Sequence, residues 1–262
     1  FATNRTTVAI YCDARPAELS AKITKLRDGL ARIKRCGLNV GSARIRAAHF
    51  RREDWAESWK RHFKPIEVGD ALLIKPSWSE RRPRKRQAVV VLDPGLSFGT
   101  GHHPTTKFCL CELTRRRDRR RPQEFLDLGT GSGILGIAAA KLGYSPVEAI
   151  ECDPESVRVA RANARVNRVP HKLLITLQDL TKLSLRPTHR YDLICANLIS
   201  TLLMAERKRI VRRLKPGGRL VVAGILKSEF DSVARAFKAA DLRLVASKVE
   251  KEWRSGVFVT VR

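Results

Sequence analysis

The stretch from residue 125 to residue 140 constrains the fold of this chain more than any other. An apolar run that contains Asp127 comes first, glycines follow at the alternate positions Gly129, Gly131 and Gly133, and small apolar residues then continue with helical spacing. This order predicts a strand, a tight loop and a helix. Glycine suits such a loop because the backbone must turn sharply and let a ligand approach where a Cβ would clash. The free N–H groups at the start of the helix face the same loop, so the stretch predicts a binding site for a nucleotide-type cofactor.

Two classes of cofactor use a loop of this kind. Gly131-x-Gly133-x-x-Gly136 satisfies the dinucleotide fingerprint, although a lone match is a weak signal. Asp127-x-Gly129-x-Gly131-x-Gly133 resembles the first motif of S-adenosylmethionine-dependent methyltransferases, in which the amino-acid end of the cofactor lies over the glycines. We favour the second interpretation because its glycines follow the strand directly, whereas the first places Gly136 well inside the helix.

The chain is strongly basic, with 52 Lys and Arg against 26 Asp and Glu and a formal net charge of +26. Such an imbalance favours a polyanionic neighbour such as RNA or a ribonucleoprotein. Many of the arginines fall singly on helix faces predicted to be solvated, and genome composition can also favour arginine. The charge therefore makes ribosomal RNA a candidate partner without demonstrating nucleic-acid binding.

Hydropathy and cysteine spacing predict a cytoplasmic protein without a metal site. No apolar run approaches the ~20 residues of a membrane span, and no charged-then-apolar signal segment opens the sequence. The six cysteines lack the two-residue spacing of zinc and thioredoxin-like sites, so we expect reduced structural thiols.

The N-terminal part predicts a small α+β domain over residues 1–52. Apolar residues spaced by three and four between Pro16 and Cys36 predict an amphipathic helix, and strands are expected at Thr7–Ile10 and Ala43–Phe50. This unit is about half of a ferredoxin-like domain, short at its start, and suits substrate recognition. Residues 53–80 are interpreted as a linker helix and connector, and residues 81–262 as the methyltransferase domain.

Beyond the glycine loop, the chain alternates between predicted strands and helices, which is typical of an α/β, doubly wound, Rossmann-like sheet. Two strands in succession, Leu242–Lys248 and Gly256–Val261, end the chain. We interpret them as a closing antiparallel hairpin, a feature expected of the methyltransferase sheet and not of the nicotinamide Rossmann sheet.

Polar residues follow several of the predicted strands. Glu151 is a candidate acceptor for the cofactor's ribose hydroxyls, whereas Asp153 is expected to cap the helix that opens at Pro154. Asp179 could hold the adenine amine, but it could equally cap a turn. Asn197 follows the fourth strand, and its amide can accept from an amine while donating to the cofactor, which suits methyl transfer to nitrogen.

Five stretches together resemble the PrmA family, the methyltransferases of ribosomal protein L11. The most diagnostic motif is the loop Phe98-Gly99-Thr100-Gly101-x-His103-Pro104-Thr105-Thr106; the stretches as a whole are residues 54–78, 92–106, 125–153, 196–199 and 214–218. The resemblance implies an enzyme that uses S-adenosylmethionine to methylate lysine side chains and the N-terminal amine of L11. It also implies that the N-terminal domain recognises that substrate.

Carried over by position, the resemblance implies cofactor contacts at Thr106, Gly129, Glu151 and Asn197, with glutamate at position 151 where the family usually has aspartate. We add Gly131 and Asp179 to the predicted cofactor-binding residues and assign Asn197 the catalytic role. His102 and His103 are candidate proton acceptors, although loop histidines more often serve packing or hydrogen bonding.

We therefore expect a monomeric protein N-methyltransferase that acts on L11. The alternatives are an RNA methyltransferase, a methyltransferase of another basic protein, and a ribosome-associated binding protein on a degenerate methyltransferase fold.

Overall fold

The computed structural model describes residues 16–35, 41–47, 63–93, 101–118 and 120–261. The chain divides into two compact units, residues 1–59 and 60–262. In the first unit, helix α1 (Pro16–Arg35) confirms the predicted amphipathic helix. Residues 41–47 form no strand, so the described half of the strand expected at Ala43–Phe50 is absent. The strand expected at Thr7–Ile10 and most of the linker helix lie outside the described residues.

A seven-stranded sheet forms the centre of the larger unit, with the strands in the order β6-β5-β4-β7-β8-β10-β9. The first five strands of this order, β6, β5, β4, β7 and β8, are mutually parallel, and β10 runs antiparallel to both of its neighbours. The strand bounds are β4 (Phe125–Leu128), β5 (Val147–Glu151), β6 (Leu173–Leu177), β7 (Tyr191–Asn197), β8 (Leu214–Ala223), β9 (Leu242–Glu250) and β10 (Trp253–Thr260). This topology confirms the predicted doubly wound sheet and its closing hairpin.

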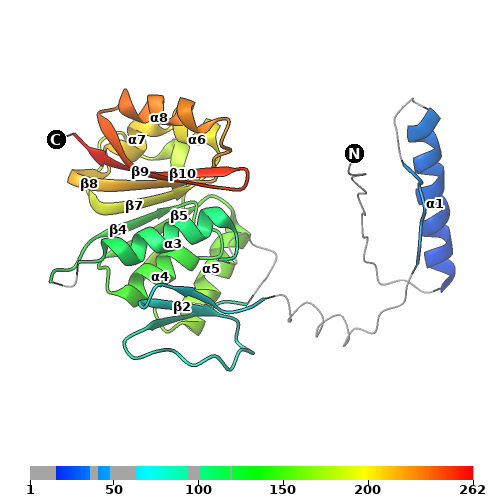
Figure 1. The fold of residues 1–262 in the computed structure, drawn as a ribbon, viewed down its shortest axis with the longest axis horizontal. Helices are drawn as coiled ribbons and strands as arrows, with labels where there is room; N and C mark the ends of the chain where they lie inside the picture. Colours follow the sequence, from blue (N-terminus) through cyan, green and yellow to red (C-terminus); the bar gives the residue numbers. More distant parts are fainter. Residues whose placement is uncertain (1–15, 36–40, 48–62, 94–100, 119, 262) are drawn as a thin grey trace. The chain divides into compact units, whose positions relative to one another are not determined.

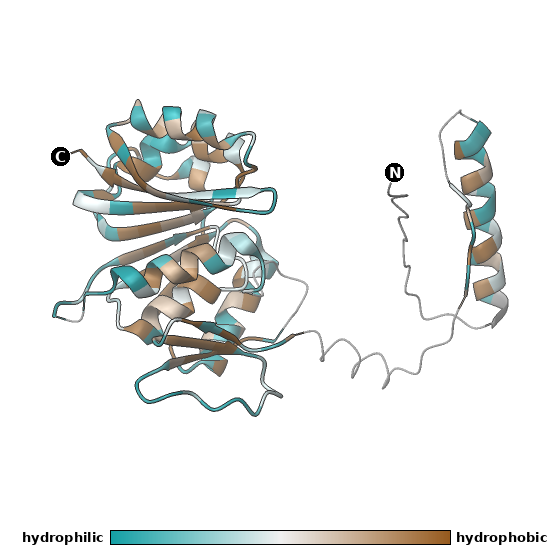
Figure 2. Ribbon diagram, viewed as in Figure 1, coloured by the Kyte–Doolittle hydropathy of each residue, from teal (hydrophilic) through white to brown (hydrophobic). Residues whose placement is uncertain are grey.

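Helices cover both faces of this sheet (Figure 1). One face carries α3 (Pro104–Arg116), α4 (Ile134–Leu142) and α5 (Pro154–Val166), and the other carries α6 (Ser200–Ala205), α7 (Arg207–Val211) and α8 (Phe230–Lys238). Successive strand residues point to opposite faces, so Leu193 and Cys195 join the first core whereas Ile194 and Ala196 join the second. The apolar strands between the amphipathic helices are visible in Figure 2.

The helix predicted at Leu202–Leu214 is replaced by two short helices and the start of a strand. The backbone at Glu206 (φ −96°, ψ 11°) leaves the helical region and separates α6 from α7, and β8 already begins at Leu214. No helix among the described residues is long and apolar enough to cross a membrane.

A second, three-stranded sheet packs against the α3–α4 side of the larger unit. It consists of β1 (Ile66–Val68), β2 (Leu72–Lys75) and β3 (Ala88–Val91). Its apolar side chains join the same core as α4. The buried side chain of Asn167 bonds both the N–H and the carbonyl of Val91, at 2.8 and 2.7 Å, and so ties β3 to the end of α5. The apolar side chains of β1 and β2 thus pack on the body of the larger unit.

Candidate functional site

The candidate site lies at the carboxyl edge of the large sheet, where β4 stands between β5 and β7. The strand order reverses its direction of winding at β4, and ligands of open α/β sheets bind outside the carboxyl ends of the strands at such a point. The predicted site residues on β4, β5 and β7 are therefore brought to one edge, although up to about 70 residues of chain separate them.

The glycine loop joins the end of β4 to α4. Gly129 has a φ of +72°, and a Cβ built on it would lie 2.6 Å from the Cδ2 atom of Leu198, which follows β7. The N–H groups of Gly129 and Thr130 both donate to the carbonyl of Ile150, at 3.0 and 3.1 Å. Only glycine fits at position 129, because its backbone is left-handed and the side chain of Leu198 is close.

Asp127 is a site residue that our sequence interpretation used only as the acid of the motif. Its side chain is 1% exposed. Oδ2 accepts hydrogen bonds from Thr130 Oγ1 at 2.6 Å and from the Gly136 N–H at 3.3 Å. Burial, together with the charge of the nearby Glu151, raises the pKa of Asp127 to about 7 against the effect of these two hydrogen bonds. Oδ1 has no hydrogen-bond partner in the described part of the chain, so a buried acceptor remains beneath the loop.

Glu151 links β5 to the glycine loop. Its Oε2 accepts from the Gly131 N–H at 3.0 Å, and its Oε1 accepts from the N–H groups of Cys152 and Asp153 at 2.8 and 3.1 Å. A carboxylate oxygen has two acceptor positions, so Oε2 can still receive a hydroxyl group. The structure thus joins two predicted site residues, Gly131 and Glu151.

Two neighbouring acids cap helices. Asp153 accepts from the N–H groups of Glu155 and Ser156 at the start of α5, as the sequence predicted. Asp179 Oδ1 accepts from the Thr181 N–H and hydroxyl, at 2.9 and 2.8 Å, at the start of the 3-10 helix Leu180–Lys182. The turn-capping alternative for Asp179 is therefore present, which leaves its Oδ2 for any ligand.

Thr106 and Asn197 meet across the site although 91 residues separate them. The Asn197 Nδ2 donates to Thr106 Oγ1 at 3.5 Å, and Thr106 is buried near the start of α3. Gly224, at the end of β8, was not singled out by sequence. A Cβ there would lie 3.0 Å from Asn197 Oδ1 and 2.8 Å from the Leu198 carbonyl. The signal available for Gly224 was a lone glycine that directly follows an apolar strand.

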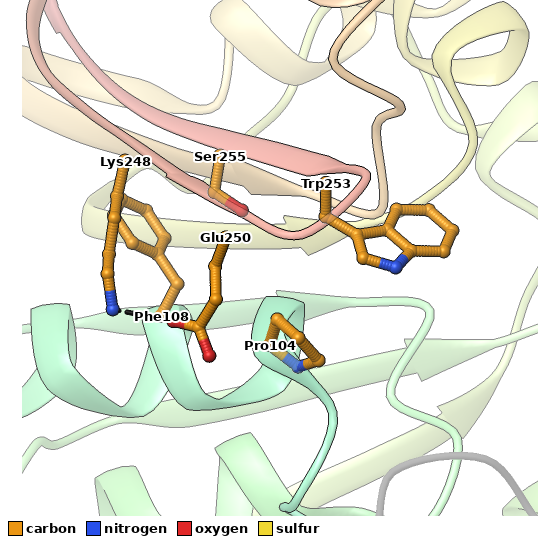
Figure 3. A pocket seen from close by; sticks show the side chains of 6 residues that line it. All are labelled: Pro104, Phe108, Lys248, Glu250, Trp253 and Ser255. Atoms are coloured by element: carbon orange, nitrogen blue, oxygen red, sulfur yellow. Dashed lines mark hydrogen bonds and ion pairs between the residues drawn. The ribbon is translucent and has the colours of Figure 1, made fainter. Parts of the chain in front are cut away.

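A small pocket adjoins the start of α3 (Figure 3). It is lined by side chains from α3 and from the β9–β10 hairpin: Pro104, Phe108, Lys248, Glu250, Trp253 and Ser255. The His103 ring packs edge-on against Trp253 with centroids 5.0 Å apart, and its Nδ1 lies 2.7 Å from Thr105 Oγ1. Partial burial lowers the pKa of His103. These contacts give His103 a packing role that holds the hairpin beside the α3 turn carrying Thr106.

The arrangement as a whole suits an adenosyl-type cofactor. The glycine loop turns sharply at the end of β4 with positive φ at Gly129, Gly131 and Gly133, and Asp127 provides a buried acceptor beneath it. Glu151 provides a carboxylate on one side of the loop, and the amide of Asn197 lies on the other, because β5 and β7 flank β4. A carboxylate, an amide and a hydroxyl can each bind and orient a ligand through hydrogen bonds.

Comparison with known proteins identifies relatives. The sequence model of the PrmA family, described as ribosomal protein L11 methyltransferase, matches residues 6–260. A protein of that name from Trichlorobacter lovleyi is 43% identical over 206 residues, covering 77% of this chain and 66% of the relative. Another from Caldanaerobacter subterraneus subsp. tengcongensis is 36% identical over 239 residues, covering 91% of this chain and 75% of the relative. The chain thus spans 66% and 75% of the length of these two relatives.

The crystal structure of a ribosomal protein L11 methylase from Lactobacillus delbrueckii subsp. bulgaricus superposes with a TM-score of 0.67 at 27% identity. The match covers 75% of this chain and 98% of that structure.

Proposed function

The chain belongs to the PrmA family, and from this membership we propose that it is an S-adenosylmethionine-dependent methyltransferase of ribosomal protein L11. The observation that carries the proposal is the hydrogen bond between Asn197 and Thr106 beside the glycine loop, because the family resemblance implies that both residues contact the cofactor. We further propose that the methylated groups are amines, namely lysine side chains and the N-terminal amine.

The residues present fit the cofactor. The turn at Gly129 and Gly131, both with positive φ, would hold its amino-acid end, and the Asp127 Oδ1 is an acceptor suited to an ammonium group. Glu151 would accept from the ribose hydroxyls through Oε2, and Asp179 would accept from the adenine amine through Oδ2. When bound, S-adenosylmethionine supplies an activated methyl group on a sulfonium.

Asn197 is proposed to orient the substrate amine. Its Nδ2 is held by Thr106 Oγ1, which turns the carbonyl oxygen into a fixed acceptor for an amine N–H. When the substrate amine donates an N–H to the Asn197 carbonyl oxygen, the lone pair on the amine nitrogen points away from Asn197. Positioning of this kind can contribute most of the rate enhancement. The amine must be neutral, whereas a lysine has an unperturbed pKa of about 10.4. An amide cannot take up that proton, so the role of Asn197 is positioning rather than proton transfer.

We also propose that the protein acts as a monomer in the cytoplasm. The described cysteines Cys109, Cys111, Cys152 and Cys195 are free thiols, which is in line with a reducing compartment.

The proposal is tested with purified protein, tritiated S-adenosylmethionine and L11 from an unmethylated source. We expect label on L11, mapped by mass spectrometry to lysine and N-terminal amines. Gly129→Arg should abolish both cofactor binding, measured by calorimetry, and labelling. Asp153→Asn, which keeps a capping side chain, is the matched control and should label normally.

Each alternative has its own signature in this assay. Label on RNA or on another protein would overturn the substrate but keep the chemistry. Failure to bind the cofactor would favour a binding protein.

A further inference from the structure

The edge of the sheet opposite the candidate site gathers cations. Because β4 to β8 are parallel, their amino ends share one edge, and the loops that precede them lie there. Arg120 precedes β4, Arg168 and Lys172 precede β6, and Arg186 and Arg190 precede β7. We call these five residues the basic edge. All five are exposed, and in the described part of the chain no carboxylate lies within ion-pair distance of their side chains.

Helix capping does not account for the basic edge. The helices of a doubly wound fold end at this edge, and the negative end of a helix dipole favours cations such as Lys141 and Arg165 in its last turn. The basic edge lies in the loops beyond the helix ends. Two carboxylates at this edge, Glu124 and Asp192, are already paired, because Lys215 bonds both of them, at 3.2 and 3.0 Å.

Lys141, at the end of α4, lies near two residues of the basic edge. Partial burial lowers the pKa of its ammonium group, and the charges of Arg168 and Lys172 act in the same direction. A bound polyanion would relieve the repulsion among these three cations.

The chemistry of the edge favours a phosphate backbone. Four of its five cations are arginines, whose planar guanidinium groups bond phosphate in a bidentate manner. From β6 to β7 the sheet order covers three intervals of about 4.8 Å, so the basic edge is about 14 Å wide, enough for more than one phosphate. Contacts of guanidinium groups with phosphate oxygens carry no information about the base sequence.

We propose that the basic edge binds the phosphate backbone of RNA independently of its base sequence. The choice of RNA over other polyanions rests on the proposed function, since the proposed substrate is a ribosomal protein. Strands of five to seven residues separate the two edges by about 15–25 Å, so RNA bound at the basic edge leaves the candidate site open to a protein substrate.

Charge reversal tests the proposal. Arg168→Glu, Lys172→Glu and Arg190→Glu are combined, and binding of a labelled short RNA duplex is measured by fluorescence anisotropy over a range of salt concentrations. We expect affinity to fall at least about tenfold. The slope of log affinity against log salt should decrease by about 2, since each lost phosphate contact contributes about 0.7–0.9.

The matched control reverses three exposed lysines at the carboxyl edge, Lys182→Glu, Lys227→Glu and Lys251→Glu, and has the same net charge. We expect its RNA affinity to stay within about twofold of the wild type. If the two variants lost RNA affinity equally, the net charge of the protein rather than the basic edge would explain RNA binding, and the proposal would be overturned. Binding to phosphatidylserine vesicles in preference to RNA, lost in the edge variant, would overturn it in favour of a lipid surface.

A further measurement separates this proposal from the proposed function. The edge variant should methylate isolated L11 at the wild-type rate, because the basic edge lies away from the candidate site. If the wild type binds RNA as expected but no variant methylates L11, the proposed substrate fails and the basic edge stands.

Discussion

Replacing the buried Asp127 with asparagine should remove a specific pH dependence of stability. Burial raises the pKa of this carboxyl from 3.8 to about 7 in the folded chain. The folded state therefore binds a proton that the unfolded state releases between these two pH values. The stabilisation that follows is fully present below the unfolded pKa and is lost as the pH rises through the folded pKa.

The size of the effect follows from the shift. Between about pH 5.5 and about pH 8 the unfolded carboxyl group is ionised throughout. The folded carboxyl group keeps its proton over about 1.5 units of that interval, up to its pKa of about 7, and is ionised above it. At about 1.36 kcal/mol per unit, Asp127 makes the wild type lose about 2 kcal/mol of unfolding free energy across the interval. Asparagine has nearly the same shape and does not titrate, so Asp127→Asn should lack this loss.

Urea unfolding followed by circular dichroism at the two pH values measures the difference. The quantity compared is the pH-induced change in unfolding free energy, wild type minus variant, because contributions from all other titrating groups cancel. Asp153→Asn serves as the control. Hydrogen bonds from Ser156 and Glu155 lower the pKa of Asp153 below its ordinary value, so it does not titrate in this interval. Equal pH dependence in the wild type and in Asp127→Asn would refute the reasoning.

Three further predictions concern the site and the helix cap beside it. Gly129→Ala should cost about 1–3 kcal/mol and weaken cofactor binding, because it forces a side chain into a left-handed conformation against Leu198; Leu198→Ala should recover part of the stability in urea unfolding, and no recovery would exclude the contact as the cause. Asn197→Ala should lower kcat by about 10²-fold or more without a large change in Tm, and Thr106→Val, which removes the acceptor for the Asn197 amide, should lower it less. Wild-type turnover by Asn197→Ala would remove the positioning role. Asp153→Ala should lower the Tm in thermal unfolding while leaving methylation of L11 intact, since it removes only a helix cap.

Local patterns in the sequence were sufficient for most of the sheet. Strands and helices of the larger unit show their periodicity over a few residues, and the glycine loop needs only its own neighbours to be recognised. The boundaries were less certain where local signals compete. The run from Leu202 to Leu214 has helical spacing, yet the backbone at Glu206 breaks it, and Leu214 pairs with Tyr191 as a strand.

The sequence by itself determined the class of fold, the family and the identity of the polar residues at the strand ends, because these depend on the order of residue types along the chain. Only the tertiary structure decided what those residues meet. Asp127 acquires its raised pKa from burial between layers, Thr106 and Asn197 become neighbours through the packing of α3 on the sheet, and Gly224 matters because β8 ends against β7. The basic edge arises in the same way, since parallel strands carry loops that are distant in sequence to one side of the sheet. Proximity in space is set by the packing of whole elements, which no local pattern encodes.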